Sequence, residues 1–373
     1  MNGITVESSA LIISVTALDM PIAAIEVGYR AKWCDAMGRA IPGLTAPVVL
    51  VSDYYVGPAA VSSQRPLHKG EVAVSLPFGI QRPGPEAYTD GTSSDPPVPP
   101  PPPEMVACAI DLVSVTLLLD GPRQNPLKVP ALSRFARVDI LRNAQVAQGT
   151  SIDNSALLMP VMSRTTTVQW PAVNGRFPAQ EHLSTGDGHG GLLLLNRVTG
   201  KVTAYNPSNG MATKAVATLD GVSAIDVTIA DDVIWTTDLR GLMPFSISGG
   251  ALVPVKIPMV DLTGVTAING RMVGIAGGVV GDVDSKHPSF RPLFTAPELP
   301  LLGRAGRLGG FVALTDVSAN RINLHNAVTG RIAGYYEMSG LVQELGGADG
   351  SASRLFVDDR LARATLVFEL IGP

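Results

Sequence analysis

Apolar residues in the C-terminal half of the chain gather into short runs that are separated by turn residues. Four of these runs have a similar character, and they begin at Asp232, Arg271, Gly310 and Ser353. Their spacings are 39, 39 and 43 residues, close to the length of a four-stranded propeller blade. Because such a module has an apolar face that only its neighbour covers, the pattern predicts a β-propeller over residues 181–373. The spacing supports five blades and leaves six or seven open.

A second pattern is a turn sequence that occurs twice. Asn-Arg-Val-Thr-Gly-Lys from Asn196 recurs as Asn-Ala-Val-Thr-Gly-Arg from Asn326, at an offset of 130 residues. A Thr-Gly pair supplies a tight turn whose glycine accepts a positive φ. The sequence resembles the Asp-x-x-Thr-Gly-Lys-x-x-Trp repeat of quinoprotein-type propellers, with Tyr205 and Tyr335 in the place of the tryptophan. The resemblance implies the architecture only, and it implies no quinone-binding residue.

The last blade predicted from this pattern is incomplete. Residues 353–359 and 364–371 supply two strands. A closed ring leaves no exposed sheet edge, so we expect an upstream segment between residues 163 and 195 to supply the missing outer strand.

The N-terminal half also alternates between strand-like runs and turn residues. Residues 1–90 predict a β-sandwich or barrel-like domain for attachment or assembly. A proline-rich linker follows at residues 91–104, since consecutive prolines form an extended strut. Residues 105–180 predict a further β segment, which holds either the first blades or the closure strand. The chain as a whole is therefore predicted to be all-β.

Composition supports this fold and excludes several classes of function. Charged residues make up 16% of the chain, with 39 Gly and 30 Pro, and the net charge is −4. Few charges and many turn residues favour short strands over long surface helices. Without a basic stripe, no specific nucleic-acid partner is expected. Cys34 and Cys108 fit no metal-binding spacing. Asp19 and Pro21 interrupt the first apolar run, so we expect neither a signal peptide nor a membrane span.

Two local clusters contain residues that bind ligands or transfer protons in other proteins. Asp187 and His189 lie in a glycine-rich stretch that lacks the Gly-Lys-Ser/Thr ending of a phosphate-binding loop. Asp282, Asp284 and His287 lie within six positions, but the stretch lacks the further oxygen ligands and the glycine of a calcium loop. We interpret both clusters as turns and keep these five residues as candidate metal ligands.

The acidic pairs Asp231–Asp232 and Asp358–Asp359 flank similar strands. Aspartates fit turns in which they bond their own backbone, and paired carboxylates also carry out glycoside hydrolysis. A propeller glycoside hydrolase or a carbohydrate-binding module is therefore the alternative function. No other catalytic motif is present, so we expect neither an enzyme nor a bound cofactor.

A β domain, a rigid strut and a propeller resemble a modular scaffold, and the combination is similar to the propeller-bearing tail proteins of short-tailed bacteriophages. That similarity implies a structural or attachment component of a virion tail, assembled in the bacterial cytoplasm. The expected partners are other protein chains of the same assembly, as a homo-oligomeric ring or adaptor contacts, with a host-surface glycan as a further candidate ligand.

Overall fold

A computed structural model describes two compact units, Met1–Val161 together with Ile371–Pro373 (unit 1) and Met162–Leu370 (unit 2). The described residues form strands and turns only, which confirms the all-β class. They are residues 4–7, 10–14, 22–35, 39–54, 71–75, 105–120, 135–142, 160–172, 182–187, 190–221, 223–238, 241–247, 250–257, 260–268, 270–296, 304–327, 330, 332–351 and 353–371.

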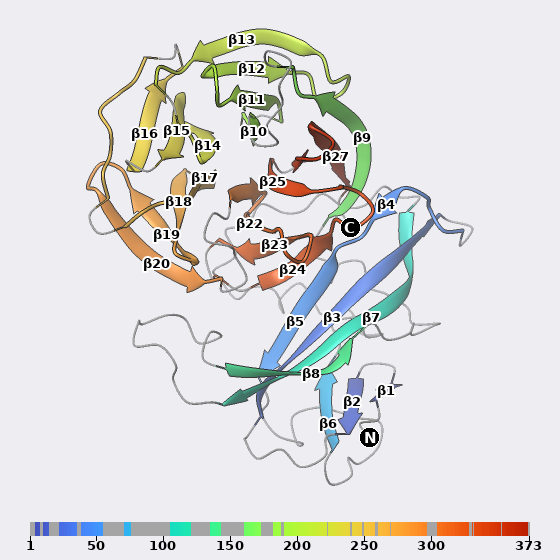
Figure 1. The fold of residues 1–373 in the computed structure, drawn as a ribbon. Coiled ribbons are helices and arrows are strands. Elements are labelled where there is room, and N and C mark those ends of the chain that lie inside the picture. The colour runs from blue at the N-terminus through green and yellow to red at the C-terminus, as the bar shows by residue number, and fades with distance from the viewer. Residues whose placement is uncertain are drawn as a thin grey trace. The chain divides into compact units, whose positions relative to one another are not determined.

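Unit 1 is built on long antiparallel strands (Figure 1). Strand β3 (Ile22–Asp35) pairs with β5 (Val48–Tyr54) on one side and with β7 (Met105–Asp120) on the other. Strand β8 (Phe135–Arg142) then pairs with β7. The remaining strands are the two-residue β4 (Leu44–Thr45) and a small sheet in the order β1 (Ile4–Glu7), β2 (Ala10–Ser14), β6 (Glu71–Ser75).

The pairing of β3 with β7 bears on the predicted domain boundary. The sequence places a linker at residues 91–104, and that segment lies outside the described residues. Strand β3 precedes the segment and β7 follows it, yet the two pair along most of their length. Residues on both sides of the proline run therefore belong to one unit, which extends to Val161.

Unit 2 consists of small sheets around a common axis, as Figure 1 shows. Its described strands form five sheets, which we number in chain order. Sheet 1 holds β10 (His182–Gly186), β11 (Leu192–Asn196), β12 (Lys201–Tyr205) and β13 (Ala212–Thr218); sheet 2 holds β14 (Asp226–Ala230), β15 (Val233–Asp238) and β16 (Gly241–Ser246); sheet 3 holds β17 (Gly264–Ile268), β18 (Arg271–Ala276), β19 (Val279–Asp284) and β20 (Ser289–Thr295). Sheet 4 holds β21 (Ala305–Leu308), β22 (Phe311–Asp316), β23 (Arg321–Asn326) and β24 (Ile332–Glu337); sheet 5 holds β25 (Leu345–Gly350), β26 (Arg354–Asp359), β27 (Ala364–Ile371) and β9 (Val161–Gln169).

The first strand of each sheet lies next to the axis, and these five strands form a closed ring. Strand β10 contacts β14 and β25, and β17 and β21 complete the circle between them. Apolar clusters lie between neighbouring sheets. One cluster includes Leu195 of sheet 1 and Phe245 of sheet 2, and another includes Ile275 of sheet 3 and Leu314 of sheet 4. The predicted propeller-like arrangement is therefore confirmed, because each sheet covers the apolar face of the next.

The sequence periodicity comes from the second strand of each sheet. The four runs used above correspond to β15, β18, β22 and β26, and β11 is the equivalent strand of sheet 1. Second strands lie inside their sheets and between two neighbouring sheets, so they are apolar along most of their length. That burial explains why these strands carry the clearest pattern.

The two Thr-Gly turns occupy different positions in their sheets. Both have the same backbone bond, from the N–H of Gly200 to the carbonyl of Asn196 at 2.9 Å and from Gly330 to Asn326 at 2.8 Å. The first turn joins the second strand of sheet 1 to the third, whereas the second joins the third strand of sheet 4 to the fourth. The offset of 130 residues therefore relates turns at two different strand positions and does not measure a whole number of sheets.

Closure of the ring follows the predicted route. Strand β9, from upstream of sheet 1, is the outer strand of sheet 5 beside β27. It begins at Val161, two residues before the predicted segment. The sequence assigned only two C-terminal strands to this sheet. The third is β25, whose sequence Leu-Gly-Gly-Ala-Asp-Gly has no apolar alternation.

The hairpin between β14 and β15 gives a first testable prediction. Asp231 and Asp232 form its two-residue turn with φ values of 50° and 59°, which is the left-handed region that type I′ turns require. We expect Asp232→Gly to raise the free energy of unfolding by about 0.5–1 kcal/mol, because a Cβ is disfavoured at positive φ and the entropy of glycine offsets part of the gain. Urea denaturation measures this. An unchanged or lower stability would contradict the turn assignment.

Candidate functional site

Asp187, from the glycine-rich cluster predicted by sequence, lies directly after β10. The Asp187 carboxylate accepts a bond from the N–H of Gly191 at 2.8 Å, and the Asp187 N–H donates to the Gly191 carbonyl at 3.0 Å. His189 lies outside the described residues. In the described part of this cluster, Asp187 therefore serves the turn.

The cluster Asp282, Asp284 and His287 is divided between two separate interactions. Arg271 and Arg291 both form ion pairs with the Asp282 carboxylate. Asp284 instead caps the next turn and accepts bonds from the N–H groups of Lys286 and His287 at 2.8 and 2.9 Å. These backbone bonds lower the pKa of Asp284. The structure thus brings Asp284 and His287 together, at 3.3 Å between Oδ2 and Nδ1, but Asp282 does not complete a metal-binding group with them.

The two acidic pairs lie at opposite ends of their strands. Asp231 and Asp232 precede β15, whereas Asp358 and Asp359 end β26. Asp359 caps the turn and accepts N–H bonds from Gln343, Glu344 and Ala362. Asp359 therefore serves a turn, as the sequence predicts for aspartates at such positions.

Two features are absent from the described residues. No group of three or more His, Cys, Asp or Glu side chains among them is placed to hold a metal ion. Within the same residues, no helix is long and apolar enough to cross a membrane.

A buried polar site lies at the axis of the ring, among residues that no local sequence pattern marks. Arg304 immediately precedes β21, at the axial end of sheet 4, and is 5% exposed. Its Nε donates to Asp226 at 2.8 Å, its Nη1 to Asp358 at 2.7 Å, and its Nη2 to the carbonyl of Ser184 at 2.8 Å. One buried guanidinium therefore links sheet 4 to sheets 1, 2 and 5. We call Arg304, Asp226 and Asp358 the axial triad.

Asp226 is the acceptor that joins three neighbouring inner strands. It begins β14, and besides Arg304 it accepts bonds from the N–H groups of Val227, Val265 and Ala305 at 2.9, 3.1 and 3.1 Å. Val265 belongs to β17 and Ala305 to β21. The carboxylate therefore accepts hydrogen bonds from backbone N–H groups of β14, β17 and β21 near the axis.

Asp358 connects the triad to the ring closure. One of its oxygens accepts bonds from Arg304 and from the N–H of Ser184 at 3.2 Å. The other accepts the hydroxyl of Thr365 at 2.7 Å. Thr365 in turn accepts a bond from the indole Nε1 of Trp170, the residue after β9, at 2.9 Å. A continuous chain of bonds thus runs from the axis to the closure strand.

Burial and charge act in opposite directions on this triad. Burial by itself lowers the pKa of Arg304, but Asp226 and Asp358 outweigh it and hold the pKa above its usual value. Burial raises the pKa of Asp226, and Arg304 and the backbone donors oppose that rise. Arg304 and the two aspartates therefore each keep their charge because of the others, as expected for ions that are removed from water.

A second arginine bridges the opposite end of the inner strands. Arg307, two residues further along β21 than Ala305, donates to the carbonyls of Gly186, Gly350 and Ala267 at 2.8, 3.0 and 3.2 Å. These carbonyls belong to β10, β25 and β17. Nearby, Asp349 accepts bonds from the Arg307 N–H and the Thr185 hydroxyl. Both ends of the axis are thus crossed by an arginine side chain.

Glycines allow the inner strands to approach the axis this closely. A Cβ on Gly306 of β21 would lie 1.8 Å from the carbonyl oxygen of Ala348 in β25, and one on Gly347 would lie 2.3 Å from Arg304 Nη1. The absence of side chains at these positions leaves room for backbone contact and for the guanidinium.

In chemical terms, each charged group of the axial site is paired with a group of opposite charge or with hydrogen-bond partners. Each carboxylate of the triad, and Asp349 beside Arg307, accepts several bonds, and all three aspartates are almost fully buried. Such an arrangement holds strands together. Sequence reasoning missed it because Arg304 lies 78 residues from Asp226 and 54 from Asp358, and no local spacing marks them as partners.

Comparison with known proteins gives likenesses of fold at low identity. No family model matches the chain, and no curated protein matches it by sequence. Among solved structures, a Myxococcus xanthus glutaminyl cyclase is similar at 12% identity and a TM-score of 0.41, covering 56% of this chain and 96% of that one. A streptogramin B lyase matches at 14% identity and 0.33, covering 52% and 66%. A putative exported protein of Bacteroides fragilis NCTC 9343 matches at 11% and 0.35, covering 56% and 95%. These likenesses assign no family to the chain.

Proposed function

We propose that this protein is a non-enzymatic structural component of a large protein assembly, such as a bacteriophage tail, in which unit 2 packs against further protein chains. The observation that carries the proposal is an apolar outer edge on sheet 2. Residues 250–257 lie beside β16 through bridges at Ala251 and Val255 instead of a regular fourth strand. On and next to this segment, Ile247, Leu252 and Val253 are 40%, 45% and 83% exposed.

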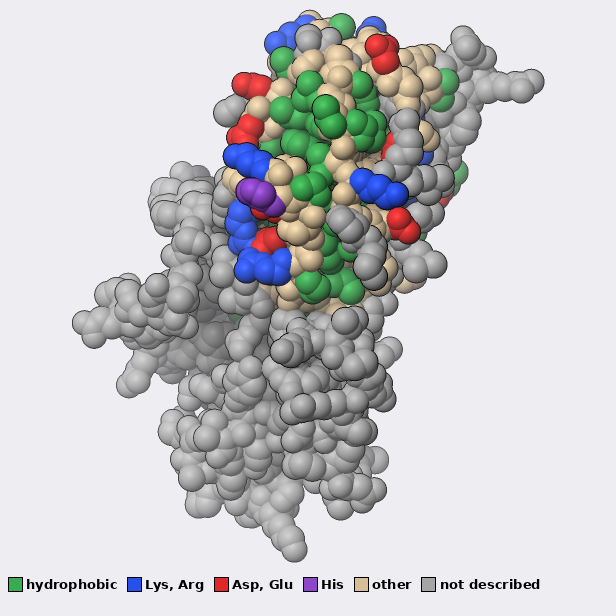
Figure 2. All heavy atoms as spheres, turned by 90° about the vertical axis from the view of Figure 1, so that its left-hand side faces the viewer, with side chains coloured by type: hydrophobic (Ala, Val, Ile, Leu, Met, Phe, Trp, Pro, Cys, Tyr) green, Lys and Arg blue, Asp and Glu red, His purple; other side chains and the backbone are tan. Residues whose placement is uncertain are grey.

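An exposed sheet edge with apolar side chains favours association with another chain. Figure 2 shows hydrophobic side chains gathered in a band on the side of unit 2 that faces left in Figure 1, with charged side chains at the borders. The low charge of the chain, 16%, is in keeping with burial of such a surface, because interface cores are depleted in charged residues. The aspartates at the axis are in keeping with the same proposal, because Asp226, Asp358 and Asp349 all accept hydrogen bonds that join strands of the ring.

The proposal predicts that the purified chain forms particles heavier than a single 38.9 kDa chain, and that the edge of sheet 2 is needed for this. We expect Val253→Glu to reduce the particle to the mass of one chain, because it places a charge in the contact. Native mass spectrometry and light scattering measure the mass.

The matched control is Val198→Glu. Val198 is 61% exposed in the turn after β11, so the change adds the same charge away from the edge of sheet 2, and the particle mass should stay as in the unsubstituted chain. A single-chain mass for the unsubstituted protein across the micromolar range would contradict the proposal. An unchanged particle mass in Val253→Glu would exclude this edge as the contact.

A further inference from the structure

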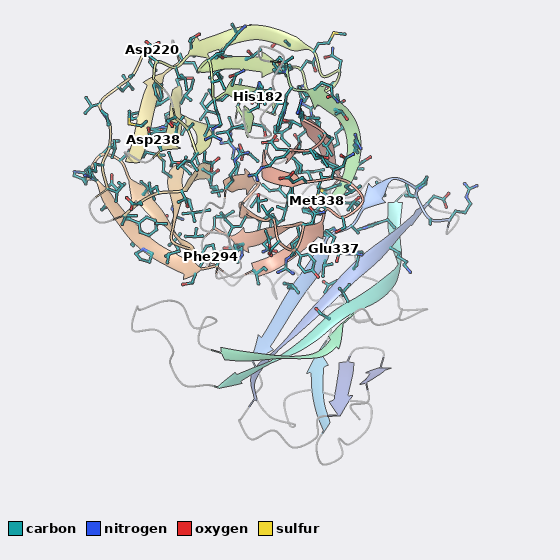
Figure 3. All side chains as sticks on the ribbon, in the orientation of Figure 1. His182, Asp220, Asp238, Phe294, Glu337 and Met338 are labelled. Atoms are coloured by element: carbon teal, nitrogen blue, oxygen red, sulfur yellow. The ribbon has the colours of Figure 1, made fainter. Side chains whose placement is uncertain are left out.

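The closure strand β9 is secured by a small buried cluster around His182, which Figure 3 places at the β10 side of the ring, far from Phe294. Trp170, directly after β9, lies against the His182 ring with centroids 5.5 Å apart and an angle of 30°. Its indole N–H donates to Thr365 of β27, and its backbone N–H donates to the carbonyl of Arg363. We call Trp170, His182, Asn196 and Thr365 the closure latch.

The hydrogen bonds of Asn196 determine the protonation state of His182 in this latch. The Asn196 Oδ1 accepts the N–H groups of Val198 and Thr199 at 2.9 and 3.0 Å. That orientation directs the Nδ2, which can only donate, at the Nε2 of His182, 3.2 Å away. The Nε2 must therefore accept, so the imidazole is neutral and carries its proton on Nδ1.

Protonation of His182 would place two N–H donors opposite each other. His182 and Asn196 are directly paired across β10 and β11 and are 4% and 8% exposed. Water therefore cannot enter between them to accept their N–H groups. A buried donor that loses its acceptor is disfavoured, because it has given up its hydrogen bonds to water. Protonated His182 is therefore less stable than neutral His182 in the position where its ring packs against Trp170.

We propose that the closure latch is a pH-sensitive device: protonation of His182 releases Trp170 and loosens β9 from sheet 5. Because β9 is the strand by which the chain passes from unit 1 into unit 2, acidification acts on the connection between the units. This inference is independent of the proposed assembly.

The charged groups around the latch do not cancel this effect. Burial lowers the pKa of His182, and Asp358 of β26 opposes that change. Asp358 is already paired with Arg304, which weakens its attraction for an imidazolium. The adjoining turns also carry cations, which are Arg197 after β11 and Arg360 and Arg363 before β27.

The direction of the pH dependence follows from this lowered pKa. The unfolded or released imidazole takes up a proton near the usual pKa of about 6.5, whereas His182 in the closed latch does so only at lower pH. The stabilisation is therefore complete above about pH 6.5 and is lost as the pH falls through the pKa of the closed state.

Hydrogen–deuterium exchange of the full chain, corrected for intrinsic rates, tests the device. Between pH 7.5 and 5.0 we expect the protection of the β9 amides to fall about tenfold or more, because the protonated ring faces the Asn196 donor without an acceptor. The amides of β18 and β19 in sheet 3 should keep their protection and serve as the internal control.

Two variants separate the latch from a general effect of acid. His182→Gln removes the titrating group, so β9 should lose no protection at pH 5.0. Asn196→Asp keeps the acceptor for the turn but replaces the Nδ2 donor by a carboxylate oxygen, which accepts a bond from protonated His182, so β9 should again stay protected. If His182→Gln does not fold, Asn196→Asp carries the test.

Two results would overturn the proposal. One is full protection of β9 in the unsubstituted chain at pH 5.0. The other is a loss of protection in Asn196→Asp that equals the loss in the unsubstituted chain.

Discussion

Replacing Arg304 with methionine is expected to lower the free energy of unfolding of unit 2 by about 3–5 kcal/mol, the range measured when one partner of a buried ion pair is removed. The variant leaves Asp226 and Asp358 buried at 0% and 1% exposure without their cation, and it also removes the donor to the Ser184 carbonyl. Urea or thermal denaturation followed by circular dichroism measures the loss.

A surface arginine provides the matched control for this prediction. Arg291 pairs with Asp282, but its side chain is 75% exposed, and exposed ion pairs contribute about 0–1 kcal/mol. Arg291→Met should therefore change the stability little. We expect Arg304→Lys to remain clearly destabilised, because an ammonium group cannot reproduce the three directed bonds of the guanidinium. Equal losses for Arg304→Met and Arg291→Met would contradict a structural role for the triad.

Gly306→Ala is the second substitution for which we expect a large effect. A Cβ at this position of β21 would lie 1.8 Å from the oxygen and 2.7 Å from the carbon of the Ala348 carbonyl. These atoms belong to the backbone of β25, so no side chain can rotate away, and sheets 4 and 5 must separate. Overpacking of a well-packed interior costs about 1–3 kcal/mol and more when the backbone has to move, so we expect a loss of about 3 kcal/mol or more.

Gly250→Ala is the control for this prediction. A Cβ on Gly250 would meet only the Ser246 hydroxyl oxygen at 3.5 Å, an ordinary contact, and surface substitutions of this kind change stability by about 0.5 kcal/mol or less. Comparison of the urea midpoints of the two variants isolates the effect of crowding at the axis. A Gly306→Ala protein as stable as Gly250→Ala would show that sheets 4 and 5 do not approach as described.

The parts of the fold that could be predicted from sequence are those whose burial is uniform. Second strands such as β22 and β26 are buried on both faces, so their apolar runs recur at the interval of the sheets. Inner strands are different, because they lie where five backbones converge. Strands β21 and β25 contain Gly306, Gly346, Gly347 and Gly350, which fit the narrow axis but resemble loops in the sequence.

The candidate site shows the same limit more strongly. The sequence singled out acidic clusters that are close along the chain, and several of their described members, Asp187, Asp284 and Asp359, serve turns. The axial triad draws instead on residues far apart in sequence, each at the end of a strand. Such partners meet only when the ring is complete, so no local spacing reveals them. Asp358 was noted as one member of an acidic pair, but its partners Arg304 and Thr365 were not.

The place of β9 in sheet 5 has a consequence for biosynthesis. The hydroxyl of Thr165 in β9 donates to the carbonyl of Val367 in β27, across 202 positions of the chain. A ribosome therefore makes β9 long before it makes the strand that β9 must join. Contacts of such long range slow folding, and an unpaired strand is open to wrong partners while it waits. We therefore expect this chain to be most prone to aggregation during translation, in the interval before β27 emerges.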